Sequence, residues 1–322
     1  MPYDRSAWRQ SQHAFASTGL EVPVDPIRNC QPFGQIMMRK LCALMITVIV
    51  LITVRPAHAN QLDDIRAAGV LRAAVFDSNP PFGSKATVSH ELVGYDVDFA
   101  AAIAKHIGVK LKLLATNPSN RIPLLQAGKA DLIVAYLTIT HRRAEVIEFS
   151  IPYFRTGVQL MVRTEDSNRF EDFIYSRIGV VRNTTQEEYL SHDFRAAKRL
   201  VYDDTPQAME ALRNGSVAAV AQDHHTLASF LATAPDRARF KILPIYLTEE
   251  SVGIGILKNR KELLDAVNGE LLELEKSGEA VRIYHKWFGS LGEAVQERNF
   301  KIAVPCEALT GWATGNCDRR LP

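Results

Sequence analysis

Cysteine, aromatic residues and an excess of charge of one sign are all scarce in this chain. Only four of the 322 residues are cysteine, aromatic residues make up 8%, and the formal net charge is +2. Four cysteines are too few for a disulfide-dense scaffold, so a hydrophobic core must hold the fold. The 47% of hydrophobic residues suffice for such a core, and the length allows two domains of ordinary size or one large one.

Long hydrophobic runs are also rare, and the longest lies near the N-terminus. The uncharged run 41–54 follows the basic stretch MRK at 38–40, and it is broken by RP at 55–56. The next residues, AHA at 57–59, supply the small side chains that a signal peptidase reads. These features predict a cleaved secretory signal, with cleavage before Asn60. Fourteen residues are short for a bilayer-spanning helix, which makes a permanent anchor the weaker alternative.

Residues 1–36 precede this complete signal and have no periodic pattern. The simplest explanation is a translation start assigned too early, with Met37 or Met38 as the true start. Residues 1–59 hold six Lys and Arg against three Asp and Glu, so their removal changes the formal charge from +2 to −1. No basic field remains to attract nucleic acid or a membrane surface.

Removal of the leader also leaves only two cysteines. Cys30 and Cys42 are lost, and Cys42 lacks the small residues that precede a lipidated cysteine. Cys306 and Cys317 remain, with ten residues between them, in a glycine-containing tail. We expect them to form a disulfide that staples the tail 291–322, because a metal site there would need further ligands.

The mature chain alternates strand-like and helix-like segments in two successive α/β units. In the first unit we expect strands at 71–77, 109–115 and 131–137, with helices at 95–107 and 121–128. In the second we expect strands at 177–181, 199–203, 217–221 and 240–245, with helices at 185–194, 205–215 and 223–232. Two helices at 263–278 and 279–289 would return to the first unit.

This order predicts two lobes, each with a mainly parallel sheet flanked by helices, and a first lobe that is discontinuous. The runs 158–163 and 251–258 are expected to be paired crossings between the lobes. Lobe one would then comprise 60–157 plus 252–290, and lobe two 158–251. A ligand would bind in the cleft between them.

Polar residues follow the strands at the points where an open α/β sheet binds its ligands. They are Asp77, Ser78, Asn79, Thr138, Thr140, Arg143, Arg182, Asn183, Thr184, Thr185, Gln222 and Asp223, and the apolar Phe82 follows the first strand with them. Phe82 and Asn183 are also expected to contact the ligand. Within this set, a guanidinium, neighbouring hydroxyls and a carboxylate from the other lobe describe a socket for a free α-amino acid. Arg143 would bind the α-carboxylate with help from Thr138 and from backbone N–H groups near Thr185, and Asp223 would bind the α-ammonium.

Several of these residues also have purely structural interpretations. Thr140 and Asp223 are positioned to be N-caps, and Thr185 forms a capping-box pattern with the glutamate three residues on. His224 and His225 resemble a metal-binding pair, but adjacent helical positions point about 100° apart. We therefore expect these two histidines to be solvated, and no metal site.

Four ordered motifs resemble the extracellular solute-binding proteins, family 3, of bacterial polar amino acid ABC transporters. They are GYDVDFAAAIAKHI at 94–107, NRIPLLQAGKADLIV at 120–134, TITHRR with EFS at 138–150, and NTTQEEYL at 183–190 followed by the AQD turn at 221–223. The resemblance spans about 61–290. It implies a two-lobed, hinge-closing periplasmic binding protein, monomeric and without cofactor, which is not an enzyme. Such a protein delivers a polar amino acid to a membrane permease, and an acidic or amide-type ligand is favoured.

The resemblance also implies roles for single residues. Arg143 matches the carboxylate-binding arginine by its spacing from Phe149, Thr138 matches a hydroxyl residue, Thr184 and Thr185 match a Gly-Thr-Thr turn, and Asp223 matches the ammonium-binding aspartate. The aspartates of the signature helix, Asp96 and Asp98, would be scaffold.

Two positions depart from the family's motifs, and one segment resembles a particular branch of the family. Asn183 replaces the usual glycine, and asparagine tolerates the left-handed conformation of such a turn. Tyr136 replaces a small or hydroxyl residue and would narrow the pocket or pack on the ligand. The NRIPLL segment resembles the glutamate/aspartate-binding branch, in which Arg121 would hold a side-chain carboxylate, although Phe76 and Thr205 replace other polar contacts of that branch.

An exported enzyme on the same scaffold is the alternative, since cyclohexadienyl dehydratases resemble this family. Such an enzyme needs an acid or base over its substrate, for which Glu249, Glu250, His224 or Tyr136 are candidates that no motif singles out. A membrane-bound sensor is disfavoured, because no apolar span follows residue 290.

Overall fold

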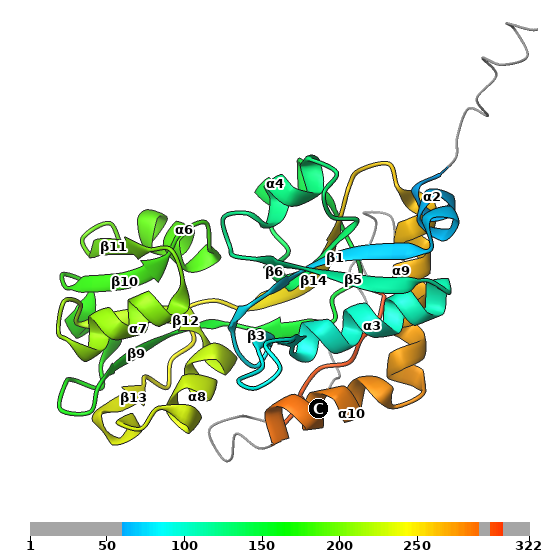
Figure 1. Cartoon of the computed structure of the whole chain (residues 1–322). Coiled ribbons are helices and arrows are strands. Elements are labelled where there is room, and N and C mark those ends of the chain that lie inside the picture. The colour runs from blue at the N-terminus through cyan, green and yellow to red at the C-terminus, as the bar shows by residue number, and fades with distance from the viewer. Residues whose placement is uncertain (1–59, 290–296, 305–322) are drawn as a thin grey trace, which may run out of the picture. The chain divides into compact units, whose positions relative to one another are not determined.

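The chain folds into two lobes, each built on one sheet, in a computed structural model that describes residues 60–289 and 297–304 (Figure 1). The sheet of lobe one has the strand order β5-β1-β6-β14-β7, with β8 paired to β14, and the sheet of lobe two has the order β11-β10-β12-β9-β13. The signal segment within 1–59 and the cysteines Cys306 and Cys317 lie outside the described residues, so both expectations stay predictions.

In lobe one, three parallel strands are joined by antiparallel strands from later in the chain. The parallel strands are β1 (Val70–Phe76), β5 (Lys110–Thr116) and β6 (Leu132–Thr138), and the antiparallel ones are β7 (Glu148–Phe149), β8 (Phe154–Thr156) and β14 (Glu250–Ile256). The helices are α2 (Gln61–Ala68), α3 (Tyr95–Ile107), α4 (Arg121–Gln126), α5 (His141–Ala144), α9 (Lys261–Lys276) and α10 (Glu279–Phe288). A small sheet contains β2 (Ser78–Asn79), β3 (Gly83–Lys85) and β4 (Leu92–Val93). The apolar run of β6 is buried at every position, as expected of a strand covered on both faces.

Lobe two repeats this mixed arrangement. Its strands are β9 (Val158–Arg163), β10 (Arg177–Val181), β11 (Lys198–Tyr202), β12 (Ala219–Asp223) and β13 (Phe240–Ile242), and its helices are α6 (Thr185–His192), α7 (Thr205–Arg213) and α8 (His224–Thr233), with short 3-10 turns at Phe170–Phe173 and Arg237–Arg239. Alternate residues of β9 point to opposite faces of the sheet. Leu160 packs in the cluster that contains Leu190 of α6, and Met161 packs in the cluster that contains Leu212 of α7. The sheet is therefore covered on both faces.

Helix α3 begins at a glycine that no other residue replaces without strain. Gly94 has φ 152°, and a Cβ at this position would lie 2.1 Å from the carbonyl oxygen of Phe82. The helix then buries Tyr95, Phe99 and Ile103 in the core of lobe one. This explains in physical terms why the GYDVDF motif begins with glycine and continues with apolar residues at helical spacing.

We predicted that the runs 158–163 and 251–258 pair with each other as crossings between the lobes, and this prediction was wrong. Strand β9 lies in the sheet of lobe two and β14 in the sheet of lobe one, so these two runs do not pair with each other. The chain crosses instead just before β9 and just before β14. There the backbone N–H of Leu247 donates to the carbonyl of Val158 (2.8 Å), and a Cβ on Gly157 would lie 2.2 Å from the carbonyl oxygen of Thr248. An apolar run signals burial, but it does not say which sheet buries it.

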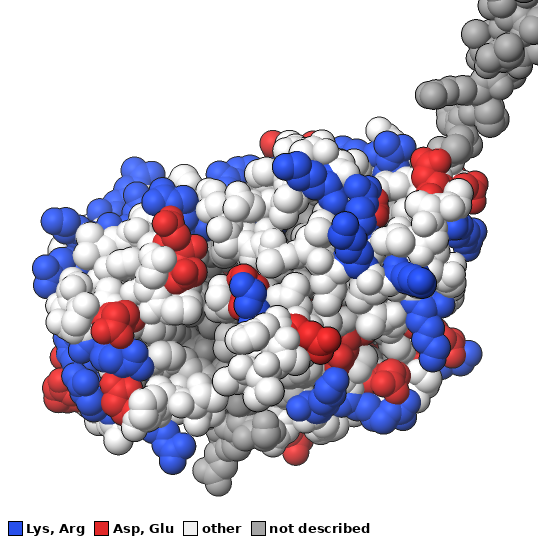
Figure 2. Space-filling view, viewed as in Figure 1, with Lys and Arg blue, Asp and Glu red and all other residues white. Residues whose placement is uncertain are grey.

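The described part of the C-terminal segment packs on lobe one. Phe300 and Ile302 are buried in its core cluster, and the guanidinium of Arg298 makes a bidentate ion pair with Glu275 of α9. Among the described residues, no helix combines the length and apolarity needed to cross a membrane. Basic and acidic side chains are interspersed over the face seen in Figure 2, which is hollowed where the two lobes meet.

Candidate functional site

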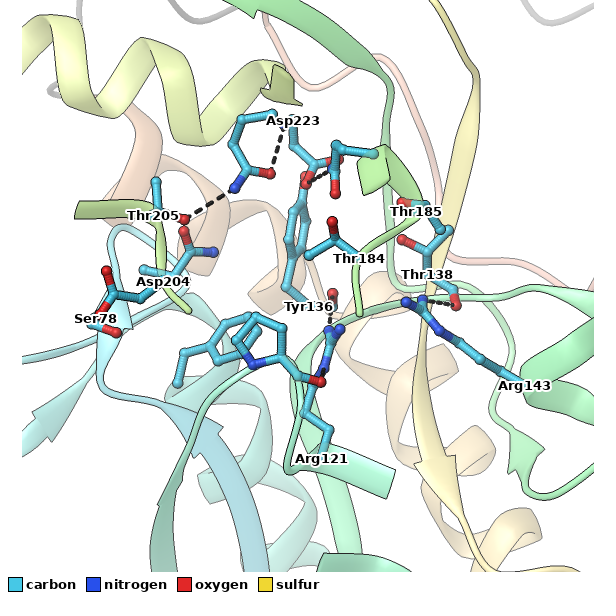
Figure 3. A pocket seen from close by; sticks show the side chains of 15 residues that line it. Ser78, Arg121, Tyr136, Thr138, Arg143, Thr184, Thr185, Asp204, Thr205 and Asp223 are labelled. Carbon is cyan, nitrogen blue, oxygen red and sulfur yellow. Dashed lines mark hydrogen bonds between the residues drawn. The ribbon is translucent and has the colours of Figure 1, made fainter. Parts of the chain in front are cut away.

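A narrow cavity lined mostly by polar residues lies between the two lobes. Lobe one contributes Phe76, Ser78, Asn79, Pro118, Arg121, Tyr136, Thr138 and Arg143, and lobe two contributes Thr184, Thr185, Gln186, Asp204, Thr205, Gln222 and Asp223 (Figure 3). Seven of the nine residues predicted to bind ligand are in this set; Phe82 and Asn183 are not. The cavity lies beyond the carboxyl ends of β1, β6, β10 and β12, where an open α/β sheet binds its ligands.

Arg143 is buried in the wall of this cavity, with 6% of its surface exposed. Its Nη1 donates to the carbonyl of Thr138 (2.8 Å), and its Nη2 donates across the cleft to the carbonyl of Asn183 (3.2 Å). The hydroxyl of Thr140 caps α5 by accepting from the backbone N–H of Arg143. Burial lowers the pKa of Arg143. These neutral partners orient the guanidinium without neutralising it.

Asp223 lies in lobe two and is 5% exposed. Its Oδ2 accepts a hydrogen bond from Nε2 of Gln186 (2.8 Å), whereas its Oδ1 has no hydrogen-bond partner in the described part of the chain. Asp223 occupies the N-cap position of α8, but its side chain makes no capping hydrogen bond to the helix. Burial, followed by the nearby charge of Glu250, raises the pKa of Asp223 well above its usual range. Within 60–289 and 297–304 its carboxylate makes no ion pair, although the charges of Arg121 and Arg143 act to lower its pKa.

Helix α6 brings its first backbone N–H groups to the same cavity. Its N-cap is Thr184, whose hydroxyl accepts from the N–H of Glu187 (3.3 Å), so the predicted capping box on Thr185 was wrong by one position. Asn183 has φ 58° in the turn, the left-handed conformation that asparagine tolerates. Its own side chain is not among the lining residues, and its contribution is the carbonyl that Arg143 contacts. Because Thr184 is the N-cap, the hydroxyl of Thr185 is available for another contact.

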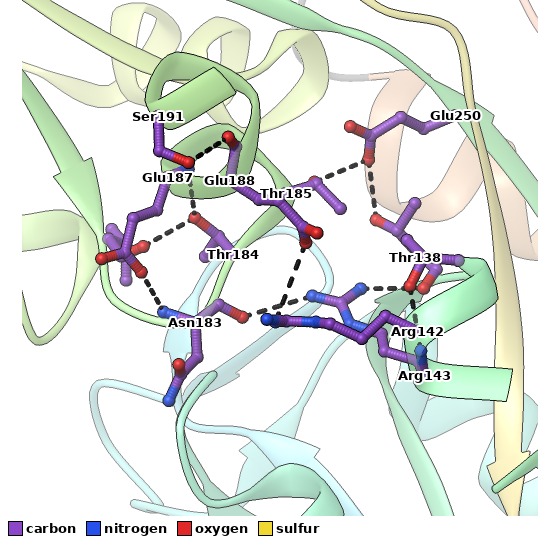
Figure 4. Close-up of polar contacts among 12 residues, drawn as sticks. Thr138, Arg142, Arg143, Asn183, Thr184, Thr185, Glu187, Glu188, Ser191 and Glu250 are labelled. Carbon is purple, nitrogen blue, oxygen red and sulfur yellow. Dashed lines mark hydrogen bonds and ion pairs between the residues drawn. The ribbon is translucent and has the colours of Figure 1, made fainter. Parts of the chain in front are cut away.

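Two of the three predicted hydroxyl residues bond to Glu250, which the sequence suggested only as an acid or base candidate for the enzyme alternative. The hydroxyls of Thr138 (2.7 Å) and Thr185 (3.0 Å) donate to the same oxygen, Oε2 of Glu250 (Figure 4). Glu250 is 9% exposed and lies at the start of β14. Its partners are 112 and 65 residues distant along the chain, so no local pattern reveals the contact.

Arg121 lines the cavity, but most of its guanidinium bonds to the backbone. Its Nη1 donates to the carbonyls of Ala135 and Tyr136, both at 3.0 Å, and its Nε donates to the carbonyl of Pro118 (3.3 Å). The guanidinium carbon lies 5.2 Å from the ring centroid of Phe76. Burial, then the charge of Arg143, lowers the pKa of Arg121 well below its usual range. Of its nitrogens, only Nη2 has no bond assigned to it within the described ranges.

Tyr136 forms part of the cavity wall in a strained backbone conformation, with φ 45°. Its N–H donates to Oδ2 of Asp96 (2.9 Å), and its ring stacks on Phe82 with 3.7 Å between centroids. Phe82 is fully buried beneath Tyr136, so its predicted contact with ligand was wrong. Asp96 is also fully buried and accepts from the hydroxyl of Tyr153 (2.6 Å), which agrees with a scaffold role.

The expectation that His224 and His225 are solvated was also wrong. Each is only 8% exposed, because the first turn of α8 packs into the junction of the lobes. Nδ1 of His224 lies 2.6 Å from Oε1 of Gln159, and the ring of His225 lies edge-on to Phe154 at 4.8 Å. Burial lowers the pKa of His225 to about 3. Among the described residues, no group of three His, Cys, Asp or Glu side chains is arranged to bind a metal.

Comparison with known sequences identifies the family. The profile of the bacterial extracellular solute-binding proteins, family 3, matches residues 71–290. The L-cystine-binding protein of Escherichia coli K12 is 27% identical over 237 residues, which are 73% of this chain and 88% of that protein. The glutamate/aspartate import solute-binding protein of Salmonella typhimurium is 28% identical over 267 residues, 79% and 88% of the two chains. The glutamate/aspartate branch is thus one of several neighbours.

Solved structures agree on the fold. A mutant of ArgBP from T. maritima superposes with a TM-score of 0.67 at 33% identity, covering 71% of this chain and 99% of that one. An ancestral amino acid-binding protein, described as a precursor of cyclohexadienyl dehydratase, superposes with a TM-score of 0.66 at 29% identity, covering 71% and 100%.

Proposed function

This chain belongs to the bacterial extracellular solute-binding proteins, family 3, and from that premise we propose that it captures one free amino acid between its lobes and delivers it to the permease of an ABC transporter. The observation that carries the proposal is a pair of buried, opposite charges on opposite lobes. Among the described residues, the Arg143 guanidinium bonds to two backbone carbonyls and to no carboxylate, and Oδ1 of Asp223 has no hydrogen-bond partner. A zwitterionic amino acid provides a carboxylate for Arg143 and an ammonium group for Asp223.

Each end of the ligand then has a defined partner. The α-carboxylate bonds to the Arg143 guanidinium and to the first N–H groups of α6, which have no partner inside their helix. The α-ammonium bonds to Oδ1 of Asp223. An unpaired buried carboxylate oxygen costs about 1–3 kcal/mol, so pairing it with a cation favours the bound state. The cation also lowers the pKa of Asp223, which burial raises in its absence.

We propose further that the ligand side chain is polar and uncharged, with the amide type first. Figure 3 places Ser78, Asp204 and Thr205 on the side of the cavity away from Arg143, and Asn79 and Gln222 also line the cavity. Both carboxylate oxygens of Asp204 already accept from Gln207. The oxygen Oδ1 of Asn79 is buried and has no hydrogen-bond partner among the described residues, so it can accept from an amide. Most of the Arg121 guanidinium is bonded to carbonyls, which leaves an acidic side chain only one nitrogen there.

The named relatives support an amino acid as the ligand, since their names give cystine, arginine, glutamine, histidine and glutamate or aspartate. Ligand groups held from both lobes also explain closure, because the closed state gains contacts that the open state lacks. We propose a periplasmic, monomeric protein for this role, exported by the signal predicted at 37–59.

A thermal-shift screen of the purified protein tests the proposal. The panel contains the twenty L-amino acids, L-cystine, arogenate and prephenate. An amino acid at a hundred times its dissociation constant adds about 2.7 kcal/mol to the free energy of unfolding, which raises the melting temperature by several degrees. A rise with L-glutamine or another uncharged polar amino acid is expected. A rise with arogenate or prephenate alone, accompanied by their consumption, would contradict the proposal and indicate the enzyme.

A further inference from the structure

Glu250 holds a position that links the cavity, both lobes and the hinge. Its Oε2 accepts from Thr138 of lobe one and from Thr185 of lobe two, as Figure 4 shows. The bond to Thr185 spans the cleft, so it exists only while the lobes are together. A carboxylate that accepts two hydroxyl bonds at 2.7 and 3.0 Å makes charge-assisted contacts, which are about twice as strong as neutral ones.

The other carboxylate oxygen of Glu250 is connected to both chain crossings. Oε1 accepts from the hydroxyl of Thr248 (3.2 Å), and that hydroxyl oxygen accepts from the backbone N–H of Val158 (3.1 Å). Val158 begins β9 directly after one crossing, and Thr248 lies in the other. One side chain therefore joins the closed cleft to the two segments that must move when the cleft opens.

These contacts also decide the roles of the two threonines. A hydroxyl has a single hydrogen to donate, and in this structure both hydrogens are directed to Glu250. Thr138 and Thr185 consequently cannot donate to a ligand carboxylate at the same time. Two arrangements are compatible with this geometry. Either Glu250 is displaced when a carboxylate binds, or it remains in place and stabilises closure around the ligand.

We propose that Glu250 is an interlobe latch, which favours the closed state and thereby increases the affinity of the amino acid site and slows release. Displacement is disfavoured because Glu250 is 9% exposed and anchored through both oxygens, and because Arg143 and the start of α6 already provide donors for the ligand. The latch rests on the proposed function for its effect on affinity, but its effect on closure does not need a ligand.

A latch and a ligand contact differ in what their removal changes. An affinity that depends on a closed state falls in proportion to the population of that state. Loss of a contact made only after closure accelerates dissociation more than it slows association. A residue that merely touched the ligand would leave the ligand-free ensemble unaltered.

The test compares Glu250→Gln and Glu250→Ala with the matched control Glu249→Gln. Glu249 is the exposed neighbour, so the control removes the same charge one residue away. Small-angle scattering of the ligand-free proteins gives the first readout. We expect a larger radius of gyration for both Glu250 variants, more so for alanine, and no change for the control. An unchanged radius in folded Glu250 variants overturns the latch, even if no amino acid binds.

The second readout is stopped-flow binding of whichever amino acid of the thermal-shift panel stabilises the protein. We expect the dissociation constant to rise about tenfold for Glu250→Gln, chiefly through the dissociation rate, and further for Glu250→Ala. Equal or tighter binding by Glu250→Gln would overturn the latch and support displacement by the ligand carboxylate. If the panel yields no binder while the radius responds as expected, the proposed function fails and the latch stands.

Discussion

At the scale of single residues, the site depends on buried charges that the protein leaves without an opposite charge. The Arg143 guanidinium bonds to two carbonyls, and among the described residues Asp223 has a partner at Oδ2 but none at Oδ1. Neither feature is needed for folding, because hydrophobic residues or a direct ion pair would serve the core as well. The ligand that we propose carries both opposite charges and would provide the physical reason for both features.

Removal of the guanidinium should abolish binding without unfolding the protein. For Arg143→Ala we expect the dissociation constant of the stabilising amino acid to rise at least about thirtyfold, since truncating one member of a buried charge pair costs about 2–5 kcal/mol. Isothermal titration calorimetry measures the loss, and circular dichroism checks the fold. Arg142→Ala is the control, because Arg142 is exposed and pairs with Glu188. Wild-type affinity in a folded Arg143→Ala protein would contradict the assignment.

Asp96 should make stability depend on pH in an unusual direction. Burial raises its pKa to about 8, against about 3.9 in an unfolded chain. Between these values the folded state keeps a proton that the unfolded state has released. The stability that this proton contributes is full below about pH 4 and is lost as the pH rises through 8, by about 5 kcal/mol at most.

Asp96→Asn tests this linkage, because the amide removes the titrating group and keeps an oxygen that can accept from the N–H of Tyr136. We expect denaturant unfolding of the variant to lose less stability between pH 5 and pH 8 than the wild type loses. The exposed Asp64→Asn protein controls for a general charge effect. Parallel curves for wild type and Asp96→Asn would show that Asp96 is ionised throughout.

Residue types at strand ends could be predicted from the sequence, whereas their partners could not. Arg143, Asp223 and Tyr136 reach the cavity because the ends of parallel strands meet at one edge of a sheet. Phe82 follows the same rule of position, but the ring of Tyr136 covers it. Glu250 follows no such rule, since its role arises only when segments distant in sequence are brought together.

At the scale of the elements, two glycines differ in whether a side chain can be added without strain. Gly94→Ala places a Cβ 2.1 Å from a carbonyl oxygen at φ 152°, whereas Gly269→Ala lies in the exposed interior of α9 with no atom within 4 Å of the new Cβ. We expect Gly94→Ala to lower the free energy of unfolding by more than about 1 kcal/mol. Gly269→Ala should raise it by about 0.5–1 kcal/mol.

Denaturant unfolding of the two variants measures these opposite effects, and each variant serves as the control for the other. Two changes of the same sign would mean that the conformation at the start of α3 does not constrain residue 94 as described.

The hydrophobic periodicity predicted most helices and strands. Local sequence did not predict which threonine caps α6 or whether the histidines of α8 are exposed. Tandem threonines followed by tandem glutamates allow two overlapping capping boxes, and the structure uses Thr184 with Glu187 rather than the next pair. The histidines of α8 lie next to each other in sequence, which suggests that one faces solvent. The first turn of α8 is instead enclosed by both lobes, and both histidines are buried.

At the scale of the whole molecule, the account requires the two lobes to act as one socket. The crossings touch at Gly157 and Thr248, and Glu250 connects them to the cleft. Ligand recognition, latch and hinge are thus one continuous set of contacts. Under the proposed function, these contacts couple closure to the binding of a molecule that carries both an α-carboxylate and an α-ammonium.

The most direct test of that claim is calorimetric titration of the stabilising amino acid beside two analogues, one lacking the α-amino group and one with the α-carboxylate converted to an amide. The account predicts measurable binding of the intact zwitterion and a loss of at least about a hundredfold for either analogue, since each leaves a buried charge unpaired. Equal affinity of either analogue would contradict recognition by Arg143 and Asp223 from opposite lobes.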